Sequence, residues 1–192
     1  MFYSFFRNIF KLLLMMFFSL EIKGAENIPK TGGFVLVANH ISYFDPMVLG
    51  AGCSRRVDYM AKKELFKNPI LRFWLLHSRV FPVNRQGTDL SSIKEAVKRL
   101  KQGRVIGLFP QGTRKSTQET DIKKGLAFLA TKAGVPIVPA LIKGTDTALP
   151  HNTKKINLTK ISVYFGEKID IERGQAYVDI AELALRRIRQ LE

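Results

Sequence analysis

Short apolar runs rich in β-branched residues alternate with amphipathic stretches along most of this chain, and this alternation constrains its fold more than any other feature. Runs of this kind, bounded by glycine and proline, are typical of buried strands. After Pro29 the predicted strands are 34–37, 57–61, 80–83, 105–109, 137–142 and 161–165. The predicted helices are 88–101, 123–133 and 176–191, and residues 65–76 are apolar with an amphipathic rim. The alternation predicts an α/β fold with a mixed, mostly parallel sheet flanked by helices.

Two of these elements carry a more detailed expectation. Thr88 is placed to cap the start of the helix at 88–101, because its hydroxyl can accept from the first free backbone N–H groups. Pro136 and Pro139 bound a short apolar run. Since proline cannot donate to a β-ladder, this strand is expected to lie at an edge of the sheet or to begin at Pro136.

Length and charge restrict the possible partners. The 192 residues fit one domain. Lys and Arg outnumber Asp and Glu by 31 to 16, giving a net charge of +15. Such a surface attracts a lipid headgroup layer, nucleic acid or an acidic carrier protein. The single Cys53 permits no internal disulfide, which suits a reducing compartment, and no Cys/His cluster suggests a zinc site.

The first 20 residues are almost all apolar and are interrupted by two cations, Arg7 and Lys11. The uninterrupted apolar run, 12–18, is far shorter than the roughly 20 residues that a membrane-spanning helix needs. We therefore expect residues 1–20 to form a helix at the membrane interface, followed by one domain at 21–192. A signal peptide and a buried core helix remain alternatives for this segment.

A histidine and an aspartate follow the strand predicted at 34–37. His40 and Asp45 lie in the sequence Asn-His-Ile-Ser-Tyr-Phe-Asp-Pro, and a loop that turns into a helix at Pro46 can bring them together. Imidazole takes a proton from a hydroxyl through one ring nitrogen, while a carboxylate on the other nitrogen fixes the tautomer and stabilises the imidazolium. The alternative is structural: an aspartate that forms a turn before proline, and a histidine that ends the strand.

Further polar residues follow the other predicted strands. Lys62 and Lys63 come after 57–61, and Arg85 comes after 80–83. After 105–109, Gly112 lets a ligand approach the backbone closely, Thr113 offers a hydroxyl, and Arg114 has a planar fork suited to phosphate. Because loops at the carboxyl ends of parallel strands carry ligands, these residues and His40 are expected to converge on one edge of the sheet.

Four blocks in this order resemble those of the glycerolipid acyltransferase family. They are Asn39-His40 with Asp45, Phe81-Pro82-Val83 with Arg85, Phe109-Pro110 with Gly112-Thr113-Arg114, and Val135-Pro136-Ile137-Val138-Pro139. Four ordered blocks are far more specific than any one of them. The resemblance covers roughly residues 22–166. It implies an α/β fold, monotopic attachment at the cytoplasmic face of the cell membrane, and no metal or bound cofactor.

The resemblance also implies roles for single residues. His40 matches the family's catalytic base and Asp45 matches its partner. The residues that it implies in substrate binding are Asn39, Lys62, Arg85, Gln111, Gly112, Thr113 and Arg114. Lys63 could take the place of Lys62. Two departures stand out, because the family usually has Glu at position 111 and often Gly where this chain has Arg79.

The activity implied by the resemblance is transfer of a fatty acyl group from acyl-CoA or acyl carrier protein to the sn-2 hydroxyl of lysophosphatidic acid. This gives phosphatidic acid for phospholipid biosynthesis. No Ser or Cys stands in a matching nucleophile motif, so we expect direct transfer. The expected partners are a membrane phospholipid surface and the two substrates, without nucleic acid. Gln111 leaves open an acyltransferase for another lyso-lipid or amino-lipid, and the alternative from another class is a non-enzymatic basic module bound to membrane or RNA.

Overall fold

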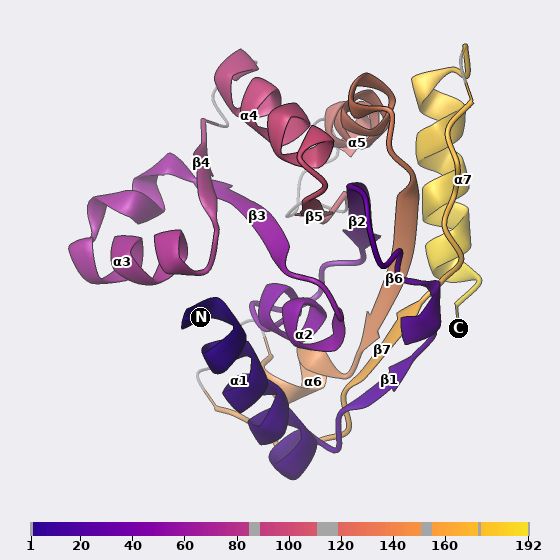
Figure 1. The fold of residues 1–192 in the computed structure, drawn as a ribbon. Coiled ribbons are helices and arrows are strands. Elements are labelled where there is room, and N and C mark those ends of the chain that lie inside the picture. Colours follow the sequence, from indigo (N-terminus) through magenta and orange to yellow (C-terminus); the bar gives the residue numbers. More distant parts are fainter. Residues whose placement is uncertain (1, 85–88, 111–118, 151–154, 173, 192) are drawn as a thin grey trace.

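The computed structural model of the chain is an α/β fold built on one seven-stranded sheet (Figure 1). It describes residues 2–84, 89–110, 119–150, 155–172 and 174–191. The strands are β1 (Glu21–Lys23), β2 (Phe34–Ala38), β3 (Val57–Lys62), β4 (Phe81–Val83), β5 (Val105–Leu108), β6 (Ile137–Lys143) and β7 (Ser162–Phe165). The α-helices are α1 (Phe2–Phe18), α2 (Asp45–Gly52), α3 (Pro69–His77), α4 (Leu90–Lys101), α5 (Glu119–Ala133), α6 (Thr145–Ala148) and α7 (Tyr177–Arg189). Two 3-10 helices are η1 (Ala25–Asn27) and η2 (Lys63–Lys67).

The sheet is mixed and mostly parallel, as predicted. The strand order is β1-β7-β6-β2-β5-β3-β4, and of the strand pairs only β6 with β7 is antiparallel among the described residues. All six predicted strands are present. The prediction missed β1, which precedes Pro29 and pairs with β7. Its sequence is Glu-Ile-Lys, and a single apolar residue is too little to mark a strand, so its pairing comes from the tertiary fold.

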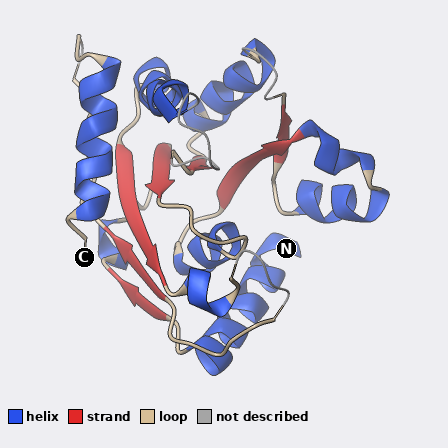
Figure 2. Ribbon diagram, turned by 180° about the vertical axis from the view of Figure 1, so that it is seen from behind, coloured by secondary structure: helices blue, strands red, loops and turns tan. Residues whose placement is uncertain are grey.

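Helices cover both faces of the sheet (Figure 2). Phe34, Leu36 and Ala38 of β2 lie in the core cluster shared with α1 and α2. Val35 and Val37 point to the other face, where α4, α5 and α7 pack. Because both faces are covered, β2 is buried along its whole length and its sequence is a continuous apolar run rather than an alternating one.

The strand that follows Pro136 and contains Pro139 lies inside the sheet. Of the two alternatives expected for it, the position at an edge of the sheet is therefore wrong. β6 lies between β7 and β2 rather than at an edge, and it begins at Ile137, immediately after Pro136. Pro139 is tolerated because it faces Gly166, just past the end of β7. The Gly166 N–H donates to the Pro139 carbonyl at 2.8 Å. Because proline has no N–H, only the hydrogen bond in the opposite direction, from Pro139 to Gly166, is missing from the ladder.

The start of α4 also differs from the prediction. The helix begins at Leu90, and the capping side chain is Asp89 rather than Thr88, which lies outside the described residues. The Asp89 carboxylate accepts from the backbone N–H groups of Ser91 and Ser92, both at 3.1 Å. A carboxylate satisfies these groups and also interacts favourably with the helix dipole.

The N-terminal helix α1 packs against α2. Leu14 is buried in the core cluster, and the Tyr3 hydroxyl accepts a hydrogen bond from the Val57 N–H. The Arg56 guanidinium donates to the Ser4 hydroxyl. Most of the remaining apolar side chains of α1 are exposed. Within the described residues, no helix combines the length and the apolar character needed to cross a membrane.

Candidate active site

The predicted site residues that the structure describes lie at the carboxyl edge of the parallel strands. Asn39 and His40 directly follow β2, and Lys62 is the last residue of β3. Phe109 follows β5, and Thr145 begins α6 just after β6. β5 and β6 are the two neighbours of β2, so His40 emerges between the loops that follow them.

His40 and Asp45 form the hydrogen-bonded pair that the sequence predicts. Nδ1 of His40 lies 2.8 Å from Oδ2 of Asp45. The aspartate is fully buried, whereas the His40 side chain keeps 24% of its surface exposed. Nε2 of His40 makes no hydrogen bond with any part of the chain that the structure describes. One ring nitrogen is therefore held by the protein, and the other is available to a substrate.

The carboxylate of Asp45 is saturated with donors. Besides His40, Oδ2 accepts from the backbone N–H groups of Ile41 and Ser42, each at 2.7 Å. Oδ1 accepts from the Thr145 hydroxyl at 2.6 Å. Asp45 is also the first residue of α2, where the helix dipole favours a negative charge. Because Ile41, Ser42 and Thr145 all donate to this carboxylate, the imidazole tautomer that fits the arrangement is the one with a hydrogen on Nδ1.

Thr145 belongs to the candidate site through its contact with Asp45, and the sequence did not single it out. It is completely buried and reaches Asp45 across 100 residues of sequence. Gly144 precedes it with a φ of 83°, and a Cβ there would lie 2.1 Å from the Lys160 carbonyl oxygen. The available signal was a Gly-Thr pair at the carboxyl end of a predicted strand, the position that also marked the other site residues.

Asn39 anchors the loop that carries His40. Its amide oxygen accepts from the Ile142 N–H at 2.7 Å, and its amide nitrogen donates to the Ile142 carbonyl at 2.8 Å. The side chain thus continues the β2–β6 pairing past Ala38, where the main chain leaves the sheet. Ser42 fixes the far side of the loop by donating to the Leu149 carbonyl. The structure shows these anchoring contacts of Asn39, and the substrate-binding role that the resemblance implies for it stays a prediction.

Two aromatic rings pack beside the imidazole, the nearer one tilted by 31° to it. The centroids of His40 and Phe109 are 4.6 Å apart, and Phe109 in turn stacks on Tyr59 with an interplanar angle of 11°. A Cβ at Gly107 would lie 2.3 Å from a carbon of the Tyr59 ring, so glycine is required for this arrangement. Burial raises the pKa of Tyr59 well above its ordinary value, which keeps the phenol neutral.

The remaining predicted residues divide into two groups. Lys62 is exposed at the end of β3, on the same edge of the sheet as His40. Those outside the described residues are Arg85, Gln111, Gly112, Thr113 and Arg114.

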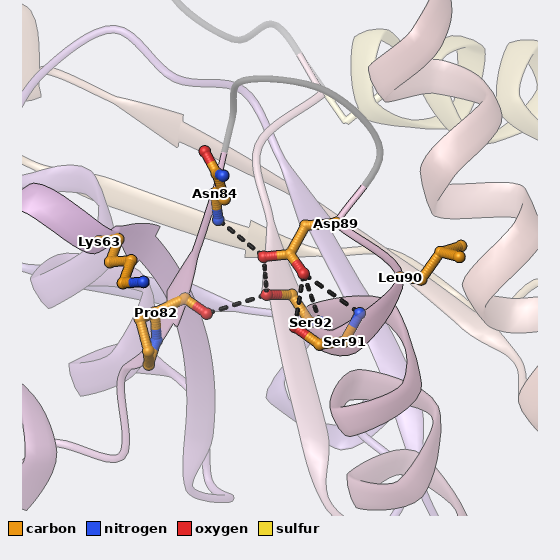
Figure 3. Close-up of a pocket in the computed structure, with 7 residues that line it drawn as sticks. All are labelled: Lys63, Pro82, Asn84, Asp89, Leu90, Ser91 and Ser92. Atoms are coloured by element: carbon orange, nitrogen blue, oxygen red, sulfur yellow. Dashed lines mark hydrogen bonds between the residues drawn. The ribbon is translucent and has the colours of Figure 1, made fainter.

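A shallow pocket lies further along this edge, between the end of β4 and the start of α4 (Figure 3). Its lining residues are Lys63, Pro82, Asn84, Asp89, Leu90, Ser91 and Ser92. Hydrogen bonds from the Ser91 and Ser92 hydroxyls and from backbone N–H groups hold the pKa of Asp89 far below its ordinary value. The pocket thus holds one cation, Lys63, and one carboxylate, Asp89, and neither His40 nor Asp45 lines it.

The contact between His40 and Asp45 has the geometry that a general base and its orienting carboxylate require. Nε2 can accept a proton from a hydroxyl, and Asp45 can stabilise the resulting imidazolium. The N–H groups of Ile41 and Ser42 are occupied by Asp45 and so cannot bind a developing oxyanion. Among the described residues, no three His, Cys, Asp or Glu side chains gather in a way that could hold a metal ion.

Comparison with known proteins agrees with this chemistry. The family model described as "Acyltransferase" matches residues 19–143, which include β1 to β6 and the whole His40–Asp45 loop. The chain belongs to the acyltransferase family. The matched range contains His40 and Asp45, whose catalytic roles stay a prediction.

Two curated relatives of this acyltransferase carry the name 1-acyl-sn-glycerol-3-phosphate acyltransferase. The protein from Bacillus subtilis is 32% identical over 198 residues, which cover 99% of this chain and 96% of the relative. The protein from Streptococcus pneumoniae is 33% identical over 89% of this chain, which spans 64% of that relative. The crystal structure of the 1-acyl-sn-glycerophosphate (LPA) acyltransferase from Thermotoga maritima superposes with a TM-score of 0.79 at 26% identity, covering 96% of this chain and 76% of the other.

Proposed function

We propose that this acyltransferase transfers a fatty acyl group from acyl-CoA or acyl carrier protein to the sn-2 hydroxyl of lysophosphatidic acid, forming phosphatidic acid. The observation that carries the proposal is the contact between His40 Nδ1 and the buried Asp45 carboxylate, which leaves Nε2 open. The relatives from Bacillus subtilis and Streptococcus pneumoniae are both named for the acceptor 1-acyl-sn-glycerol 3-phosphate. Their names support this choice of acceptor.

The reaction follows from the geometry of this pair. Nε2 of His40 removes the proton from the acceptor hydroxyl while Asp45 stabilises the imidazolium through Nδ1–H. The acceptor oxygen attacks the thioester carbonyl, forming an ester bond and breaking the C–S bond. The proton on Nε2 then passes to the departing thiolate, which returns His40 to its neutral form. Thr145 and Asn39 act as positioning residues, since the first holds Asp45 and the second holds the His40 loop.

The acceptor phosphate needs cations near His40. Lys62 lies at the same sheet edge, and it is part of the proposed phosphate site. Arg85 and Arg114, with Gln111, Gly112 and Thr113, belong to that site on the strength of the sequence blocks alone. Charge-assisted bonds from these groups position the hydroxyl against Nε2.

The N-terminal helix is proposed to hold the enzyme at the cytoplasmic face of the membrane without crossing it. Phe5, Leu12 and Met16 are exposed, and they can enter the acyl boundary of one leaflet. Residues 1–20 would form this interface helix, and residues 21–192 the acyltransferase domain. The net charge of +15 adds attraction to anionic lipid.

An acyl-transfer assay with purified protein tests the reaction. Several lyso-acceptors should be offered with both acyl-CoA and acyl carrier protein as donors, and we expect lysophosphatidic acid to be preferred. His40→Ala should lower kcat by about 10²–10⁴, the usual contribution of a general base. A folded His40→Ala protein with activity within a few-fold of the parent would contradict the mechanism. A preference for a phosphate-free acceptor would instead favour the lyso-lipid or amino-lipid alternative.

A further inference from the structure

The segment from Lys63 to His77 is folded but buries none of its residues. It consists of η2 and α3, and neither helix contains a buried side chain. α3 nevertheless has the mostly apolar sequence Pro-Ile-Leu-Arg-Phe-Trp-Leu-Leu-His. Figure 1 shows α3 to one side of the sheet, beyond β3 and β4, rather than packed on either face. A helix of a soluble protein normally buries its apolar stripe, so this surface indicates an interaction site.

The exposed apolar residues of the segment lie on most sides of the helix. Ile70 is 72% exposed and Trp74 is 42% exposed. The other large apolar side chains exposed there are Leu65, Leu71, Phe73 and Leu76. An apolar surface that surrounds a helix is typical of a helix immersed in an apolar phase rather than of one that fits a narrow groove.

This surface continues that of α1. The rings of Phe6 and Trp74 meet edge to face with their centroids 5.0 Å apart. From there α1 presents its own exposed apolar side chains, which include Phe5, Ile9, Leu12, Leu13, Met15, Met16 and Phe17. Figures 1 and 2 both place the N-terminal end of α1 beside α3. The two helices together therefore make one extended apolar surface.

The charges around α3 favour an anionic occupant. From Lys62 to His77 the sequence contains four Lys and Arg residues, Lys62, Lys63, Lys67 and Arg72, against the single acid Glu64. All four cations are exposed. Long cationic side chains can reach lipid headgroups while the apolar residues beside them enter the acyl region.

We propose that η2 and α3 are a second membrane-docking element, which binds the surface of an anionic phospholipid bilayer beside α1. Lys62, the last residue of β3, directly precedes η2, so docking puts this cation and the carboxyl edge of the sheet at headgroup level. A lipid acceptor then reaches the site without leaving the bilayer. This consequence rests on the proposed function, whereas the docking itself does not require catalysis.

Trp74 is the one tryptophan of the chain, so it reports on α3 directly. The full-length protein should be mixed with vesicles of phosphatidylcholine and phosphatidylglycerol, with and without bromine on the upper acyl carbons. We expect the emission to move to shorter wavelength and the brominated lipid to quench it. Unchanged emission from protein that floats with the vesicles would overturn the proposal. A shift that depends on protein concentration without vesicles would overturn it too, because it would make a second copy of the chain the occupant.

Two variants test the contribution of α3 to vesicle binding while α1 is left unchanged. Ile70→Ser combined with Leu76→Ser removes exposed apolar groups from α3 only, and it should weaken vesicle binding at least tenfold. Val178→Ser on α7 is the control, since Val178 is 47% exposed and lies on a helix that packs on the opposite face of the sheet from α1. Its binding should stay within twofold of the parent. Equal binding by the α3 variant and the control, with both folded, would contradict the proposal.

Activity on a dispersed substrate keeps this proposal distinct from the proposed function. A short-chain lysophosphatidate below its micellar concentration needs no bilayer, so the α3 variant should acylate it at the parent rate. On vesicle-bound acceptor the same variant should be slower in proportion to its lost binding. If the parent acylated neither form, the proposed function would fail, and the Trp74 measurement would still decide whether α3 docks.

Discussion

Replacing Asp45 by asparagine tests the role of the buried carboxylate more sharply than removing it. Asparagine keeps the shape, and its carbonyl oxygen can stand where Oδ2 now accepts from His40, Ile41 and Ser42. The new amide NH₂ then faces the Thr145 hydroxyl, which can rotate to become the acceptor. The loop and the imidazole tautomer are therefore retained, and the main loss is the negative charge.

The size of the effect follows from the charge that His40 gains during the reaction. An imidazolium and a carboxylate about 4 Å apart attract by about 4 kcal/mol at an effective dielectric constant of about 20. The amide dipole of asparagine retains part of this attraction, so we expect a loss of about 3–4 kcal/mol. Since each 1.36 kcal/mol is about tenfold in rate, kcat should fall by about 100- to 1,000-fold.

The matched control is the other fully buried aspartate for which the structure records ion pairs. Asp58 pairs with Arg99 and Arg104 on the face of the sheet covered by α4, away from the His40 loop. Asp58→Asn removes the carboxylate partner of Arg104 and one of the two carboxylate partners of Arg99, which keeps Glu95; breaking a buried ion pair in this way typically costs about 3–5 kcal/mol of folding free energy. It should lower Tm strongly but leave kcat of the folded enzyme within about twofold of the parent.

The assay is the steady-state acylation of lysophosphatidic acid, with the folded fraction of each variant measured by thermal unfolding. We expect Asp45→Asn to lose kcat with little change in KM, because Asp45 is buried and does not touch the acceptor. The reasoning would be refuted if Asp45→Asn kept kcat within about threefold, or if both variants lost kcat equally at the same folded fraction.

Two further predictions concern Thr145 and Asp89. Thr145→Val removes the donor to Asp45 Oδ1 and should lower kcat about tenfold at unchanged KM, as expected for a bond to a charged group, whereas Thr145→Ser should retain activity. Steady-state kinetics of the two variants check this, and equal losses would show that packing rather than the hydroxyl matters. Asp89→Ala removes the α4 cap and should lower Tm by about 2–4 °C at pH 7. Because folding lowers the pKa of Asp89 from its ordinary 3.8, the carboxylate stabilises the folded protein at pH values above 3.8. The Tm difference between Asp89→Ala and the parent should therefore shrink as the pH falls below about 4. A Tm difference that does not change with pH would contradict this.

Local pattern was sufficient to predict six of the seven strands and the contact between His40 and Asp45. The interior strands β2, β5 and β6 are apolar runs because helices cover both faces of the sheet, and apolar residues also marked β3, β4 and β7 in the sequence. His40 and Asp45 are five residues apart, and the turn between them closes over local backbone N–H groups. A contact over so few residues forms without any particular arrangement of the rest of the chain, so it could be predicted from sequence. The same two residues belong to the blocks that resemble the acyltransferase family.

Contacts between distant residues were decided only by the tertiary structure. Asn39 reaches Ile142 across 103 residues, and Thr145 reaches Asp45 across 100, because β6 lies next to β2 in the sheet. The same strand order puts Pro139 inside the sheet and pairs β1 with β7. Side-chain periodicity records which face of an element is apolar, but not which element covers it. For that reason residues 65–76 were recognised as apolar from sequence, while only the fold left α3 uncovered beside α1.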